Sequence, residues 1–274
     1  PSITGASLPL SDLRYAACAA LRLSPPKLFE RCGALPSSVD YHAGRFLFEH
    51  FPDGIDFPPV VLPPLPDDLP RAEAPAYSID DATTTEIDDA FSLVERADGS
   101  FRVGVHIAAP ALGIAPDSEL DRIARRRLST VYMPGDKITM LPPQAIERHT
   151  LAAGKAVPAL SFYADVAPTL ELTGTESRVE MVWIQSNLRH DALEDVFNEQ
   201  AVRARHVAHD FGGELLRLHD FAQRLEADRG RPDLNREART EYSFHVEAER
   251  VSIVERKRGM PIDKVVSELM ILGN

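Results

Sequence analysis

Cysteine is scarce in this chain of 274 residues, and its apolar runs are short and interrupted. The two cysteines, Cys18 and Cys32, are too few for a disulfide framework, and they lack the neighbouring ligands that a zinc site needs. They indicate free thiols in a reducing compartment, so we expect a cytoplasmic protein. The short apolar runs argue against a membrane-spanning helix and a membrane partner, and the first residues show no signal peptide.

The chain is also poor in positive charge. Lysine and arginine number 30 against 42 aspartate and glutamate residues, so the formal net charge is -12. This balance argues against a protein whose whole surface binds nucleic acid, because phosphate contacts need cations. An acidic exterior can still coexist with one basic channel. Two local basic clusters, residues 125–127 and 256–258, are each interpreted as solvated faces.

The composition nevertheless supports a folded protein with a helical beginning. An apolar fraction of 44% is enough for a hydrophobic core. Residues 1–51 are expected to form a small domain of three short helices, the first capped by Ser11 or Asp12 and the third by Ser37 or Ser38. Such a group is typical of a helix-turn-helix or winged-helix unit. Residues 52–75 are rich in proline, which predicts a stiff, extended linker.

After the linker the hydrophobic period changes to two. Residues 101–107 alternate apolar and polar side chains, which predicts a half-buried strand. The dipeptide Asp98-Gly99 just before it predicts a hairpin with the preceding segment. Further strands are expected at 160–166, 178–184, 242–246 and 251–255, and helices at 118 onward, over most of 191–229, and from 261. The expected fold class is α+β, a mixed sheet with helices packed against it.

The most informative segment is the acidic run at residues 80–89, which reads DDATTTEIDD. Strand-like apolar sequence lies on both sides, so this run is not a solvated acidic tail. Carboxylates held this closely repel one another and resist burial, and a hard divalent cation with oxygen ligands is the usual compensation. The run is therefore a candidate metal site at the open end of the predicted hairpin.

Two other interpretations of the acidic run are weaker. A calcium-binding EF-hand loop needs Gly at its sixth position and Glu at its twelfth, where this run has Thr85 and Phe91. A purely structural acidic turn would explain a pair such as Asp88-Asp89 more readily than five carboxylates. The interpretation that remains is metal-assisted phosphoryl transfer, in which one or two Mg²⁺ ions bind carboxylates and a substrate phosphate.

Four ordered segments resemble the RNase II/RNB family of exoribonucleases. The acidic run resembles the catalytic signature of that family, and residues 103–108 (VGVHIA) resemble the strand that follows it. Residues 127–135 (RLSTVYMPG) with 138–142 (ITMLP) resemble its Tyr-x-Pro-Gly and Met-Leu-Pro segment. Residues 266–274 (VSELMILGN) resemble its Glu-Leu-Met-Ile helix. Together the matches cover residues 76–274 in the right order.

The resemblance implies a Mg²⁺-dependent enzyme that hydrolyses single-stranded RNA from the 3′ end and releases nucleoside monophosphates. It implies catalytic and metal-binding roles for four carboxylates, those of Asp80, Glu86, Asp88 and Asp89. Asp81 matches no acid of the family and is expected to lie outside the ligand set. Tyr132 is expected to bind RNA by lying against the terminal bases, since an aromatic ring stacks on any base.

The chain also departs from the family pattern. Glu86 stands where the family usually has Asp, and its extra methylene moves the carboxylate by about a bond length. Ala109 replaces a frequent Asp, and His190 replaces a tyrosine of some members. The oligonucleotide-binding barrels that usually precede the RNB domain are absent, and the helical segment takes their place.

The resemblance further implies that the RNB domain continues beyond Asn274, so the chain is expected to be a fragment. A further chain segment or a second polypeptide would then complete the site. Two alternatives stay open. One is an RNB-like protein that binds RNA without cutting it. The other is a DNA-binding regulator led by the N-terminal helices, which the acidic charge argues against.

Overall fold

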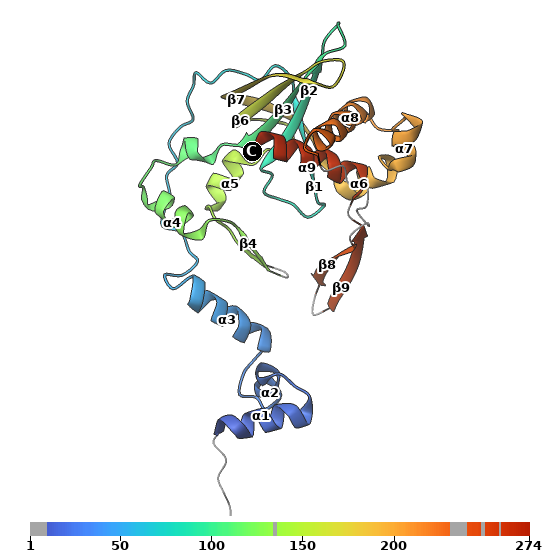
Figure 1. The fold of residues 1–274 in the computed structure, drawn as a ribbon. Coiled ribbons are helices and arrows are strands. Elements are labelled where there is room, and N and C mark those ends of the chain that lie inside the picture. The colour runs from blue at the N-terminus through green and yellow to red at the C-terminus, as the bar shows by residue number, and fades with distance from the viewer. Residues whose placement is uncertain (1–9, 134–135, 231–239, 248–249, 258) are drawn as a thin grey trace, which may run out of the picture. The chain divides into compact units, whose positions relative to one another are not determined.

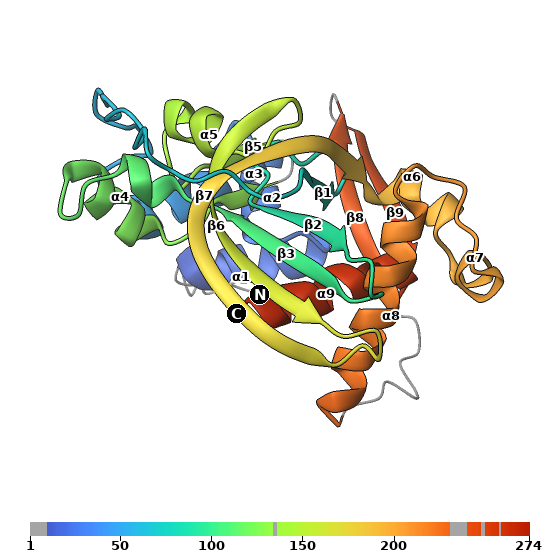
Figure 2. The ribbon, with the colours of Figure 1, turned by 90° about the horizontal axis from the view of Figure 1, so that it is seen from above.

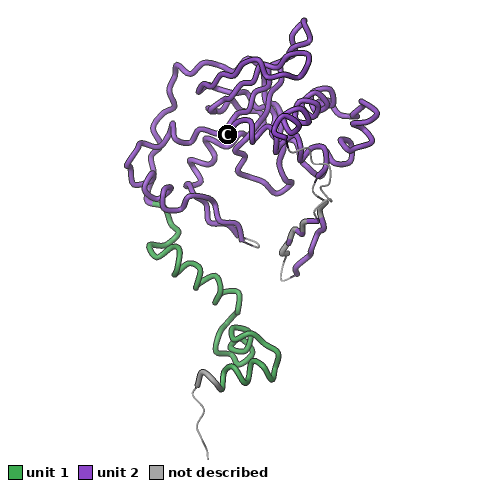
Figure 3. The backbone as a smooth tube through the Cα atoms, in the orientation of Figure 1, with its two compact units in different colours: residues 1–57 green, residues 58–274 purple. Residues whose placement is uncertain are grey.

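The structure, a computed structural model, describes residues 10–133, 136–230, 240–247, 250–257 and 259–274. It divides into two compact units, residues 1–57 and residues 58–274, drawn in different colours in Figure 3. Residues 58–75 of the predicted linker therefore group with the second unit. There Arg71 forms a parallel β-bridge with Met181, and the Arg148 guanidinium donates to the carbonyl oxygen of Pro63 at 2.5 Å.

The first unit contains the predicted helices, as α1 (Leu10–Leu21), α2 (Pro25–Arg31) and α3 (Ser38–His50). The expected cap of the first helix is wrong, because α1 already begins at Leu10 and both Ser11 and Asp12 lie inside it. The cap of α3 is Ser37, whose hydroxyl accepts from the backbone N–H groups of Val39 and Asp40. Cys18 is buried and Cys32 is exposed, and both are free thiols.

The second unit is built around a closed sheet in the order β1-β2-β3-β6-β7. Its strands are β1 (Ala76–Asp80), β2 (Asp89–Glu95), β3 (Phe101–Ala108), β6 (Lys155–Val166) and β7 (Leu172–Arg189). The predicted hairpin is confirmed, since β2 and β3 pair antiparallel around a turn in which Gly99 has a φ of 83°. The strands expected at 160–166 and 178–184 are also confirmed, as parts of the longer β6 and β7.

Strand β7 closes the sheet because it pairs on both of its edges. It runs antiparallel to β6 through Ile184 and then parallel to β1, where Asp80 lies opposite Arg189. Figure 2 shows this long strand curving round the others. The mixed sheet expected from the sequence is therefore present, and its closure into a small barrel is the new feature.

The outer face of the barrel carries the main hydrophobic core. Phe91, Val103 and Val105 alternate with inward-facing side chains and are buried against helices. The helices expected after the sheet are confirmed. They are α6 (His190–Val196), α7 (Glu199–Ala204), α8 (Gly212–Asp228) and α9 (Pro261–Gly273), seen on one side of the sheet in Figure 1. Two ion pairs join α9 to the end of α8, Arg229 with Glu268 and Lys264 with Glu226.

The inner face of the barrel is closely packed and combines a polar group with a small apolar cluster. His106 is fully buried and bonds through its two ring nitrogens to the hydroxyls of Ser92 at 2.8 Å and Ser161 at 2.7 Å. A β-carbon at the neighbouring Gly104 would lie 2.4 Å from the Ser92 hydroxyl oxygen, so only glycine fits there. Small and branched apolar side chains, among them Ala90 and Val182, are buried on the same face. Side chains therefore fill the barrel interior, which is not a channel.

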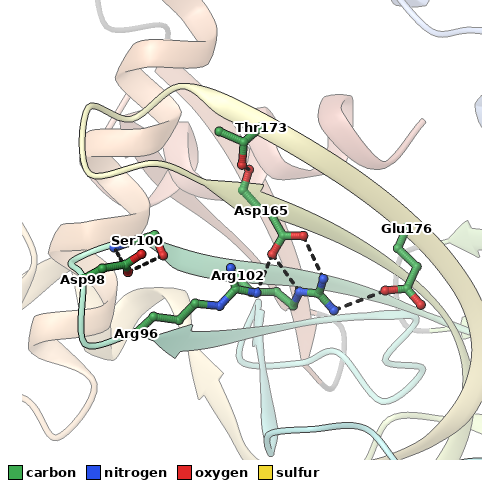
Figure 4. A network of polar contacts seen from close by, with 7 residues as sticks. All are labelled: Arg96, Asp98, Ser100, Arg102, Asp165, Thr173 and Glu176. Atoms are coloured by element: carbon green, nitrogen blue, oxygen red, sulfur yellow. Dashed lines mark hydrogen bonds and ion pairs between the residues drawn. The ribbon is translucent and has the colours of Figure 1, made fainter.

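At the end of β2 remote from the acidic run, an ion-pair network ties the hairpin turn to β6 and β7 (Figure 4). The guanidinium of Arg102 donates to both carboxylate oxygens of Asp165, at 2.9 and 2.7 Å, and Arg96 donates to one of them at 2.7 Å. The hydrogen bond from Arg102 is the main reason why the pKa of Asp165 lies below its usual value. Arg102 also reaches Glu176 on β7 at 3.2 Å.

The remaining elements form two small sheets and short helices. The turn η1 (Pro110–Gly113), α4 (Glu119–Arg127) and α5 (Pro143–His149) flank a hairpin of β4 (Val131–Met133) and β5 (Asp136–Ile138). Strands β8 (Thr240–Glu247) and β9 (Arg250–Lys257) form a second hairpin at the two expected positions. Within the described parts of the chain, no helix combines the length and apolar character needed to cross a bilayer.

The buried His106 predicts acid sensitivity of the fold. Burial, with the Arg178 charge nearby, lowers the pKa of His106 to about 4. Since the unfolded chain binds this proton near pH 6.5, stability is lost as pH falls from 6.5 towards 4, by about 3 kcal/mol. Urea unfolding at several pH values should show this slope, and His106→Gln should flatten it. An unchanged slope in the variant would contradict the assignment.

Candidate active site

The acidic run forms the connection between β1 and β2. Asp80 is the last residue of β1 and Asp89 is the first residue of β2, so the run lies at the rim of the barrel. This is the open end of the β2–β3 hairpin, as the sequence indicates. Strand pairing therefore fixes both ends of the run, and the intervening residues form a loop.

Backbone hydrogen bonds hold this loop against the rest of the unit. Ile87 is buried, its N–H donates to the Thr150 hydroxyl at 2.8 Å, and its carbonyl oxygen accepts from the N–H of Leu151 at 2.9 Å. The Arg189 guanidinium donates to the carbonyl oxygen of Asp81 at 2.9 Å. The N–H of Ala108 donates to the carbonyl oxygen of Asp88 at 2.8 Å. Main-chain hydrogen bonds therefore fix the loop in place.

A chain of hydrogen bonds orients Asp80. The Ser78 hydroxyl donates to its carboxylate at 2.5 Å, and Ser78 in turn accepts from the side-chain amide of Asn187 at 2.9 Å. Asn187 lies opposite Ser78 in the parallel β1–β7 pairing and also donates to the carbonyl oxygen of Leu151. The closure of the barrel therefore sets the direction in which Asp80 points.

Three carboxyl groups of the loop titrate above their usual range. Burial raises the pKa of Asp89 to about 6, and the charges of Asp80 and Asp88 add to the effect. Loss of surrounding water also raises the pKa of Asp88, followed by the charges of Glu86 and Asp80. The pKa of Asp80 is raised by burial, although Ser78, Arg189 and His190 oppose the shift. The structure therefore brings Asp80, Asp88 and Asp89 within electrostatic reach of one another.

Their chemistry fits a divalent cation. Carboxylate oxygens are the ligands that Mg²⁺ prefers, and a cation would relieve the repulsion that raises these pKa values. Among the residues that the structure describes, however, no three His, Cys, Asp or Glu side chains are already arranged to hold a metal. The site thus supplies the right donors, in an arrangement that is not preassembled.

Glu86 differs from the other predicted ligands because both of its oxygens have partners. The Lys137 ammonium lies 2.5 Å from one carboxylate oxygen, and the Thr130 hydroxyl donates to the other at 3.0 Å. Lys137 also donates to the Thr85 hydroxyl at 2.8 Å. These partners come from the β4–β5 region, 44 and 51 residues further along the chain. A metal-binding role for Glu86 stays a prediction.

A pocket of about 490 Å³ adjoins the loop. Of the acidic residues, Glu86 and Asp88 line it, and Tyr132 lies on its wall with 70% of its surface exposed. Burial and the nearby Glu86 charge raise the pKa of Tyr132, while Lys137 opposes the shift. The rest of the lining is mainly apolar, and it includes Ile107, Leu128, Met140, Leu141, Ala145 and Ile146. Tyr132 therefore presents an open aromatic face beside the carboxylates.

The other residues singled out in the sequence lie outside this group. Asp81 is exposed, and its main chain is what Arg189 contacts. His190 begins α6 and is nearly buried, with one ring nitrogen 3.9 Å from a carboxylate oxygen of Asp263. Ala109 precedes the turn η1. Sequence patterns missed the supporting residues Lys137, Thr150 and Asn187, because no local signal marks a polar side chain whose partner is distant in the chain.

A barrel rim that carries mutually repelling carboxylates beside a pocket defines a candidate metal-dependent enzyme. The comparison with known families agrees: the family model described as the RNB domain matches residues 70–274. The chain belongs to the RNB family. The resemblance to this family that the sequence segments indicated is therefore confirmed, and so is the predicted fold class.

Relatives of this chain include nucleases and one protein without that activity. Exoribonuclease 2 of Proteus mirabilis is 28% identical over 221 residues, which cover 77% of this chain and 33% of that protein. Mycoplasma genitalium RNase R, solved with ribose methylated single-stranded RNA, shares the fold with a TM-score of 0.62 and 16% identity over 76% of this chain and 33% of its own. Yeast Ssd1, a pseudonuclease, matches with a TM-score of 0.51 and 19% identity, over 61% of this chain and 21% of its own. The matched region thus spans about a third of Exoribonuclease 2 and about a third of RNase R.

The repulsion within the carboxylate group predicts a stability cost that a metal would offset. Asp89→Asn removes one charge without changing side-chain size, so in EDTA the variant should melt roughly 2–4 °C higher than the wild type. Adding Mg²⁺ or Mn²⁺ should raise the melting temperature of the wild type, since a ligand bound only by the folded state stabilises it, and should leave the variant almost unchanged.

The matched control for this thermal experiment is Asp68→Asn, because Asp68 is exposed and acidic and lies outside the acidic run. It should behave like the wild type in both buffers. A metal-induced shift of wild-type size in Asp89→Asn would contradict the role assigned to Asp89.

Proposed function

We propose that this chain forms part of a Mg²⁺-dependent exoribonuclease that acts in the cytoplasm and degrades single-stranded RNA from its 3′ end to nucleoside 5′-monophosphates. The observation that carries the proposal is the group of Asp80, Asp88 and Asp89, whose pKa values are raised at the rim of the barrel. Membership of the RNB family and the exoribonucleases among its relatives support it. Since the matched region spans a third of those proteins, the activity is proposed for the protein of which these residues form part.

In this proposal Asp80, Asp88 and Asp89 hold Mg²⁺ at the pocket. When bound, such an ion polarises a phosphodiester, lowers the pKa of an attacking water and stabilises the leaving oxygen. The chain's own contribution is to keep three carboxylates together against their repulsion. Ser78 and Asn187 orient Asp80, while the main-chain contacts of Ile87 and Asp88 fix the loop on which the other two stand.

The pocket wall supplies a binding surface for a nucleotide. We assign the exposed ring of Tyr132 to stacking on a base near the RNA end, because base–aromatic stacking contributes about 1–3 kcal/mol per base and tolerates any sequence. The mainly apolar lining suits the flat face of a base, and Asp88 at the same pocket places a carboxylate beside the nucleotide bound there. The three helices of the first unit fit a helix-turn-helix module.

An RNA-binding protein without nuclease activity is the second candidate function. Two observations favour it: Glu86 is engaged by Lys137 and Thr130, and the described residues hold no preassembled metal group. The fold is also shared with a pseudonuclease. The two candidates differ in one measurable product, since only the nuclease releases mononucleotides.

Asp88→Asn separates chemistry from binding. The variant removes one carboxylate at the pocket and keeps the side-chain size, so RNA cleavage in Mg²⁺ should fall by roughly 100-fold or more. RNA affinity measured in EDTA should change little, or improve, because a negative charge near the phosphates is lost. The assay follows nucleoside monophosphates released from an unstructured oligonucleotide that is labelled uniformly along its length.

Asp68→Asn again serves as the control and should retain wild-type turnover. Wild-type protein that binds the oligonucleotide but releases no mononucleotide in Mg²⁺ or Mn²⁺ would favour the binding protein. Normal turnover in Asp88→Asn would remove the carboxylate group from the mechanism.

A further inference from the structure

The β4–β5 hairpin is held at the pocket by one acidic residue of the loop. The hairpin pairs only with itself, through the registers Val131 with Ile138 and Tyr132 with Lys137, so it lies outside the barrel sheet. Its polar links to the acidic run come from Lys137 and from Thr130, the residue before β4. Both side chains reach Glu86. Apolar packing contributes as well, because Ile138 on β5 is buried, but the polar connection from the hairpin to the loop centres on this carboxylate.

The Lys137–Glu86 ion pair is partly buried and has a defined geometry. Glu86 is 11% exposed and Lys137 is 35% exposed, so water screens the pair only in part. The Thr130 hydroxyl donates to Glu86 and also accepts from the N–H of Met140 at 3.2 Å, which fixes the hydroxyl direction. The two oxygens of one carboxylate thus bind the residue before β4 and the middle residue of β5.

Tyr132 stands directly across the hairpin from Lys137. Side chains opposite each other in an antiparallel pair lie on the same face, about 4.5–5.5 Å apart at their β-carbons. The strand pairing therefore couples the position of Tyr132 to that of Lys137. Because Tyr132 is 70% exposed, little packing holds its ring, and the pairing with Lys137 is its link to Glu86.

The same contacts argue against Glu86 as a metal ligand. A divalent ion placed on this carboxylate would stand close to the Lys137 ammonium, and two cations on one carboxylate repel each other. The longer side chain of Glu, compared with Asp, also suits a reach towards the hairpin rather than towards the barrel rim.

We propose that Glu86 is a positioning residue, which holds the β4–β5 hairpin through Lys137 and Thr130 and so keeps Tyr132 over the pocket to receive the end of an RNA strand. This inference rests on the proposed function for its ligand. Its structural part, the dependence of the hairpin on Glu86, can be measured without RNA.

The first experiment measures hydrogen exchange of the metal-free protein over residues 128–141. Glu86→Gln and Lys137→Met should each speed exchange in this segment, because each removes the ion pair that holds the hairpin. Lys264→Met is the matched control: the Lys264–Glu226 pair is 2.8 Å long, with exposures of 30% and 13%, and lies between α9 and α8. It should leave exchange in residues 128–141 unchanged.

The second experiment measures the dissociation constant of a single-stranded RNA oligonucleotide in EDTA. Glu86→Gln and Lys137→Met should each weaken binding roughly 5-fold, the low end of what base stacking contributes. The double variant should be no weaker than either single variant, since both break one interaction. In a Tyr132→Ala background, Lys137→Met should have no further effect, which a general loss of stability would not reproduce.

Metal affinity separates the positioning role from ligation. The Mn²⁺ concentration that gives half of the maximal rise in melting temperature should be the same for Glu86→Gln as for the wild type. A rise of 10-fold or more in that concentration, with hydrogen exchange unchanged, would overturn the inference and make Glu86 a ligand. If the variants exchange faster but the wild-type protein binds no RNA, the positioning role of Glu86 stands. The proposed function then fails, and with it the assignment of Tyr132 to RNA.

Discussion

The site depends on the parallel pairing between β1 and β7. In the order β1-β2-β3-β6-β7 four successive contacts are antiparallel, so the first and last strands run in the same direction and can close the sheet only in parallel. That register sets Ser78 beside Asn187 and Asp80 beside Arg189. Asp80 is thereby placed at the rim where β2 begins with Asp89. The β1–β2 pairing sets the two ends of the acidic loop side by side, and the closure adds the contacts of Asn187 and Arg189 at its β1 end.

The connection between β1 and β2 gathers carboxylates that repel one another. Burial and mutual repulsion disfavour the ionised forms of Asp80, Asp88 and Asp89, and the hydrogen-bonded barrel around His106 provides the rigidity that holds them. Such destabilising groups are common where a protein binds a cation or acts on a substrate. The pocket wall has a different support, because the hairpin that carries Tyr132 is linked to the loop by the Lys137–Glu86 ion pair and by hydrogen bonds from Lys137 and Thr130.

Local patterns predicted what local interactions determine. The alternation at residues 101–107 and the Asp98-Gly99 turn identified β3 and its hairpin, and the flanking strands placed the acidic run at a sheet end. The closure was missed because hydrophobic period carries no information about a partner such as Asn187, 109 residues from Ser78. The same applies to Lys137 and Glu86, separated by 51 residues. The first helix cap was misplaced because capping residue types also occur inside helices.

The central claim is that the acidic loop binds a divalent cation through Asp80, Asp88 and Asp89, while Glu86 stays with the hairpin. Anomalous diffraction from crystals soaked in Mn²⁺, recorded at the manganese edge, tests it most directly. The account predicts a peak at coordination distance from the oxygens of these aspartates, with Glu86 still paired to Lys137. Absence of a peak at saturating Mn²⁺, or a peak bonded to Glu86 with Lys137 displaced, would contradict it.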